Sequence, residues 1–155
     1  MAFATSGVFG ALLEDALENT AALDLNLDAM KVALFDNVTA PDVDAATAAA
    51  SFAGGVWTTT NEVIDGANWP TGGESLVTPT FARAAGVLTF DGVNTVQTGA
   101  SCTLADVYGA FVYDDAVADQ GLCFNDFGGV QAVTAGDFTI QWHTDGIFTI
   151  TFTAA

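Results

Sequence analysis

The chain has 155 residues, of which 51% are hydrophobic, and its two basic residues, Lys31 and Arg83, face nineteen Asp and Glu for a formal charge of −17. This balance argues against nucleic-acid binding and against anionic membrane surfaces, because both depend on clustered Lys and Arg. Twelve Phe, three Trp and two Tyr set it apart from disordered acidic chains, and 14% charged residues leave apolar surface for contact with other subunits.

The length predicts a single β-rich domain over 1–155, with an N-terminal arm and helix over 1–28 and a β-sandwich over 30–155. The apolar stretch 1–10 lacks the basic flank of a signal peptide, and no run is long enough to span a membrane. No metal-binding spacing accompanies Cys102 and Cys123, so we expect them to be buried small hydrophobic residues rather than a disulfide or a reactive thiol.

The first predicted element is an amphipathic helix that begins after the N-cap Ser6 and ends near Asn19. The apolar run 30–36 predicts the first long strand. For the Ala/Thr stretch 45–50, which follows a proline and two acids, a short helix is favoured over an extended surface loop. Repeated Gly and Pro between 54 and 73 predict a long loop.

From residue 75 onward, β-branched and aromatic residues alternate with small or polar ones in short runs. The predicted strands are Ser75–Ala82, Gly86–Asp91, Val107–Tyr113, Gly121–Phe127, Asp137–Trp142 and Ile147–Thr153. The turn 143–146 ends in Asp-Gly and is predicted to join the last two strands as a hairpin. The predicted fold class is mainly β: an antiparallel β-sandwich or flattened barrel with one N-terminal α-helix and a long Gly-rich loop.

Patterns for catalysis or metal binding are sparse. The single histidine, His143, excludes a His-based triad within one chain and is expected to be exposed or to cap the hairpin. Asp114, Asp115, Asp119 and Asp126 offer the oxygen ligands of a weak Ca²⁺ or Mg²⁺ site, but an acidic solvated turn is the favoured interpretation. We therefore expect no active site, no cofactor and no resident metal, and an acidic secreted hydrolase is the least favoured function.

The candidate subunit contacts are apolar residues of the N-terminal arm and the Gly-rich loop: Phe3, Val8, Phe9, Trp57 and Trp69. The wider candidate regions are 1–10, 41–73 and the end 154–155. The two loop tryptophans also offer rings for stacking on sugars, although packing into the core or against a neighbouring subunit is favoured. The low charged fraction predicts a homo-oligomer, a trimer or a dimer.

Several motifs follow one another in a set order along most of the chain. An opening helix is followed by a Lys-Val-Ala-Leu strand in 30–37. After it come Glu62-Val63, Trp69–Gly73, Leu76, Gly86–Asp91, Tyr108–Asp114, Phe138–Trp142 and Asp145–Ile150. In this order the motifs resemble those of a group of small virion proteins of tailed bacteriophages. The resemblance brings no catalytic residue with it.

The resemblance implies a non-enzymatic structural protein of the virion. The expected role is a head decoration (cement) or minor capsid protein that binds the major capsid protein. The alternative is a tail- or fibre-associated protein that recognises a host surface. A chain at −17 is repelled by DNA packed inside a head, so the outer surface of the head is the expected location.

Overall fold

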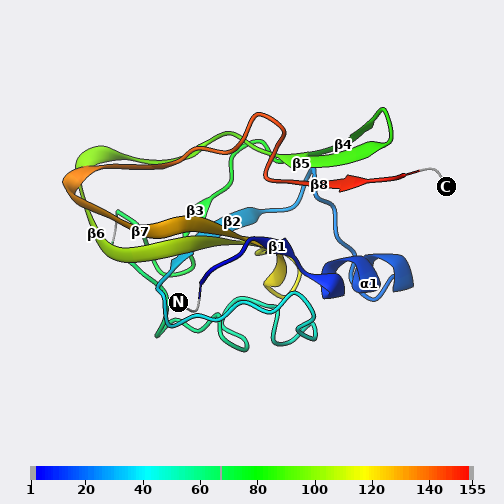
Figure 1. The fold of residues 1–155 in the computed structure, drawn as a ribbon, viewed down its shortest axis with the longest axis horizontal. Coiled ribbons are helices and arrows are strands. Elements are labelled where there is room, and N and C mark those ends of the chain that lie inside the picture. The colour runs from blue at the N-terminus through cyan, green and yellow to red at the C-terminus, as the bar shows by residue number, and fades with distance from the viewer. Residues whose placement is uncertain (1–2, 67, 154–155) are drawn as a thin grey trace.

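The computed structural model describes residues 3–66 and 68–153, which form two antiparallel sheets and one short helix (Figure 1). The large sheet has the strand order β1 (Gly7–Val8), β7 (Gln120–Ile140), β6 (Thr95–Asp114), β2 (Met30–Phe35) and β3 (Glu74–Ser75). The small sheet has the order β4 (Thr80–Ala84), β5 (Val87–Asp91) and β8 (Phe148–Thr151). The mainly β fold class is confirmed, and of its two predicted forms the structure has the flattened sandwich.

The large sheet is buried on both faces. Along β2, Val32 and Leu34 face the core shared with the small sheet, whereas Ala33 and Phe35 face a second core on the other side. The loop 36–73, in cyan beneath the large sheet in Figure 1, covers this second core together with the N-terminal arm. Double burial explains why the run 30–35 is almost continuously apolar rather than alternating.

Aromatic rings fill the second core. The Trp57 ring stacks on Phe111 with 4.5 Å between centroids and meets Phe35 edge-on at 5.0 Å. Phe3 and Phe9 from the N-terminal arm contact the same indole at 6.1 and 5.9 Å. Such edge and stacked contacts add to the stabilisation from buried area, so the irregular loop is held by packing rather than by regular hydrogen bonding.

A long bent hairpin, β6–β7, dominates the large sheet. Its register runs from Asp114↔Gln120 at the turn to Thr95↔Ile140 at the open end, with shifts between Gln97 and Gly109 and one more between Val112 and Tyr113. Positive φ at Asp106 and Ala135 marks these irregularities. In Figure 1 the bend lies at the left, and beyond it the two strands run back toward the small sheet at the upper right. The predicted strands 107–113 and 121–127 are therefore the closed half of two much longer strands.

Helix α1 (Gly10–Glu18) starts later than predicted. Its N-cap is Phe9, and the predicted cap Ser6 instead accepts the Asp126 N–H at 2.9 Å, because 7–8 pair with β7 as β1. The predicted end is confirmed: Asn19 takes a left-handed conformation at the C-cap and donates its N–H to the Asp15 carbonyl.

The stretch 45–50 forms turns, so the favoured short helix is wrong and the loop alternative is right. One helical hydrogen bond forms, from the Ala50 N–H to the Ala46 carbonyl, before Ser51 bridges to Gln120 and Phe52 donates to the Asp119 carbonyl. Docking on the β6–β7 turn stops the helix after a single turn, and so short a helix is marginal alone.

Two predicted strands are divided or paired differently. Positive φ at Thr78, followed by Pro79, breaks the run 75–82 into β3 and β4 of different sheets. The predicted hairpin between 137–142 and 147–153 is wrong, because β7 ends in the large sheet and β8 pairs with β5 in the small one. The turn itself forms, with the Gly146 N–H donating to the His143 carbonyl at 2.9 Å.

Candidate functional site

The five residues predicted to contact another subunit pack within their own chain. Phe3, Phe9, Trp57 and Trp69 are all fully buried, and Val8 is half-buried in β1. The loop tryptophans thus pack into the core, as favoured, and their rings present no face to a sugar. Contact of these residues with another subunit stays a prediction. The ends 1–2 and 154–155 of the candidate regions lie outside the described residues.

The residues singled out for their chemistry serve local structure. His143 is exposed and caps its turn, since its Nδ1 accepts the Asp145 N–H at 3.2 Å. Cys102 and Cys123 are buried free thiols, which confirms their role as small hydrophobic residues. Burial raises the pKa of both thiols, so neither is an activated nucleophile.

The acidic turn of the β6–β7 hairpin does not gather its carboxylates around one point. Asp114 Oδ1 accepts the N–H groups of Ala116 and Val117 at 2.8 and 3.2 Å. Asp115 Oδ2 lies 3.1 Å from Lys31 Nζ. Within 3–66 and 68–153, no three His, Cys, Asp or Glu side chains are placed to hold a metal ion.

A buried polar cluster fastens the Gly-rich loop to the large sheet. Glu62 Oε1 accepts the Gly72 N–H at 2.7 Å, and the Tyr113 hydroxyl donates to the Gly72 carbonyl at 2.8 Å. Burial raises the pKa of Glu62 to about 7, although the Gly72 hydrogen bond lowers it in part. Both side chains are directed at the loop backbone, so the geometry is that of an anchor rather than an acid–base catalyst.

An apolar groove opens at the end of the sandwich where α1 meets the small sheet. The Phe81 N–H donates to Asn26 Oδ1 at 2.7 Å, which ties the segment 23–26 to β4 beside it. The cavity measures about 250 Å³. Its lining is mostly apolar: Leu12, Leu13, Ala16, Leu23, Asp24, Leu25, Asn26, Phe81, Phe148 and Ile150.

Exposed large side chains extend this groove. Leu17 is 86% exposed and follows Leu13 by one helical turn, so both lie on the same side of α1. Leu27 is 83% exposed just after the lining segment, and Phe152, one residue past the end of β8, is 59% exposed. We call the groove and these residues the end patch. Exposed apolar side chains next to an apolar groove are typical of a surface that contacts another molecule.

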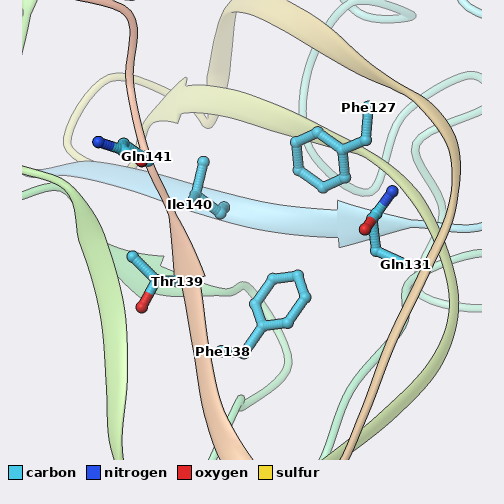
Figure 2. Close-up of a pocket in the computed structure, with 6 residues that line it drawn as sticks. All are labelled: Phe127, Gln131, Phe138, Thr139, Ile140 and Gln141. Carbon is cyan, nitrogen blue, oxygen red and sulfur yellow. The ribbon is translucent and has the colours of Figure 1, made fainter.

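A second cavity, which we call the side groove, lies within the bend of β7 and measures about 300 Å³. Figure 2 shows Phe127 and Gln131 on one side of it and the segment 138–141 on the other. None of its lining residues carries a charge: Phe127, Gln131, Phe138, Thr139, Ile140 and Gln141. The side groove thus presents aromatic rings and side-chain amides, which suit contact with an uncharged group.

Comparison of the chain with protein-family models, with curated proteins and with solved structures gives no match. Among the described residues, no helix is both long and apolar enough to cross a lipid bilayer. The functional argument therefore depends on the surfaces just described. The end patch is the feature whose chemistry is most specific, because it exposes leucine and phenylalanine on a strongly acidic chain.

Proposed function

We propose that this chain is a structural protein of a tailed-bacteriophage virion, a head decoration or minor capsid protein on the outer surface of the head. The end patch is the observation that carries the proposal, because a protein whose role is attachment needs exposed apolar surface rather than a reactive centre. The order of motifs in the sequence supplies the virion context. The major capsid protein is the proposed partner.

The proposed mechanism is cementing. An end patch buried against a shell gains from the removal of leucine and phenylalanine side chains from water, about 25 cal/mol per Å². A decoration protein that spans a junction between capsid subunits stabilises the closed shell, because local opening must also break the decoration contacts. The charge of −17 favours the outer face, away from packed DNA.

The alternative, a tail- or fibre-associated protein that binds a host surface, loses the aromatic residues first suggested for it, since Trp57 and Trp69 are fully buried. Copy number separates the two functions. A decoration protein is expected at hundreds of copies per particle, whereas a tail protein is expected at few. Quantitative mass spectrometry of purified particles makes this count, and a few copies would contradict the decoration role.

Charge placed in the end patch is expected to weaken attachment. Leu17→Asp combined with Leu27→Asp puts carboxylates where apolar contact is proposed, and we expect at least about ten-fold weaker binding. The assay is co-sedimentation with particles stripped of this protein. Val38→Asp is the matched control, because Val38 is also exposed, at 72%, but lies in the loop that follows β2. Equal binding by all three proteins would contradict attachment through the end patch.

A further inference from the structure

The bent middle of the β6–β7 hairpin contributes no charged residue of its own. No Asp, Glu, Lys or Arg occurs in 92–105 or in 127–136, although nineteen acids are present in the chain. These two segments are far apart in sequence but pair with each other, with Cys102 opposite Gly136 and Leu104 opposite Val133. Folding therefore brings two neutral segments together, and we call their part at 101–105 and 127–136 the neutral surface. On its β6 side it meets one carboxylate, because Asp65 Oδ2 accepts the Thr103 N–H at 2.7 Å, so its uncharged side is that of β7.

This neutral surface is exposed. Val130 is 52% exposed, and Ala132 and Thr134 are exposed on the same strand, as is Ala105 on β6. In Figure 1 the bend lies at the left, and α1 with the free end of β8 lies at the right. The neutral surface and the end patch thus occupy opposite ends of the sandwich, so both can be engaged at once.

The bend also has an open strand edge. On the side of β7 away from β6, β1 pairs only with Cys123 and Phe124, and no other described strand follows it along 125–140. The Asp126 N–H on that edge is taken by Ser6 Oγ, and the side groove begins at Phe127. An edge with free backbone groups beside a groove can accept a further strand.

The charge of the chain indicates which partner binds at the neutral surface. A basic partner is attracted to the acidic faces of this chain, and the neutral surface adds nothing to that attraction. A second copy also carries −17 and is repelled from every acidic face, so two copies can approach closely only across uncharged surface. The neutral surface thus meets the requirement specific to self-association.

We infer that the neutral bend of β6–β7, with the open edge of β7, is the contact between two copies of this chain in a two-fold dimer. The two β7 edges run antiparallel across the axis. Positive φ at Gly129 and Ala135 limits the regular edge to 130–134. With the axis near Val133, the two Asp137 residues lie beyond opposite ends of this edge rather than against each other.

Sedimentation velocity on the purified full-length chain tests the inference without any particle, so its outcome is separate from that of the virion proposal. At about 10 to 100 µM in physiological salt, the chain is expected to be a dimer. The double variant Val130→Glu, Ala132→Glu is expected to dissociate at least about ten-fold more readily, because it places like charges at the contact. Val38→Glu is the control and is expected to dimerise as the unchanged chain does.

A cysteine scan gives an independent readout. Cys102 and Cys123 are buried, so a cysteine introduced at an exposed position reports on intermolecular contact with little background. An equimolar mixture of the Ala132→Cys and Thr134→Cys variants, whose cysteines lie opposite each other across an axis near Val133, is expected to form a disulfide-linked dimer under mild oxidation, and Val38→Cys is not. A monomeric chain throughout the concentration range would overturn the inference. A dimer that is unaffected by the double variant and cross-links no better at these sites than at Val38 would do the same.

Discussion

Replacing Trp57 by alanine is expected to lower the free energy of unfolding by about 3 to 5 kcal/mol, which is a large part of the total stability of a domain of this size. The Trp57 side chain is fully buried and contacts rings from the N-terminal arm, from β2 and from β6. Its removal leaves a cavity that these rings cannot all close, and the loop 36–73 loses its main attachment to the large sheet.

Urea unfolding followed by circular dichroism measures this loss. Trp142→Ala is the matched control, because Trp142 is only partly buried, and its removal is expected to cost less than half as much. The structure adds a second expectation: the Trp57 variant should become sensitive to proteolysis within 36–73 before it unfolds globally. A loss of under about 1 kcal/mol would mean that the loop is held by other contacts.

The protein is expected to be more stable near pH 5 than near pH 8, and Glu62 is expected to cause a substantial part of the difference. Burial raises the pKa of Glu62 to about 7 in the folded chain, from 4.5 as the ordinary value. Between these values the folded chain binds more protons than the unfolded chain, so stability falls as the pH rises. The fall is complete above about pH 7, and the pKa difference corresponds to at most about 3 kcal/mol.

Glu62→Gln isolates this contribution, because glutamine keeps the acceptor for the Gly72 N–H but does not ionise. The variant is expected to lose less stability than the unchanged chain between pH 5 and pH 8. Asp114→Asn is the comparison, since burial raises the pKa of Asp114 to about 6 and acts with the same sign over a narrower range. Parallel stability profiles for the unchanged chain and Glu62→Gln would contradict a raised pKa at Glu62.

The elements predicted correctly are those whose signal is local. The strand β2 is an almost continuous apolar run, and Asn19 ends the helix with a residue that tolerates positive φ. The sequence predicts too short a β6–β7 hairpin, because apolar and polar residues alternate little in its middle and its register shifts at bulges. The prediction of the last hairpin is wrong, because a turn sequence specifies a chain reversal but not the sheet that the next strand joins.

The candidate sites show the same limit. The Gly-rich loop and its tryptophans were correctly located, but whether Trp57 faces a core or a partner depends on the second face of the large sheet. The apolar stripe of α1 was predicted too, yet it does not say which members are covered. The structure buries Leu12 and leaves Leu17 exposed, and this division creates the end patch.

Because trypsin cleaves only after Lys and Arg, this chain has two cleavage sites, and each reports the opening of a different part of the fold. Lys31 lies in β2, between β6 and β3, and its side chain is tied to Asp115. Arg83 is exposed on β4, at an edge of the small sheet. Cutting at Arg83 therefore follows local fraying of an edge strand, whereas cutting at Lys31 requires the large sheet to open. One digestion distinguishes the two kinds of opening by the site that is cut. Proteolysis can therefore measure fraying of the small sheet separately from opening of the large sheet.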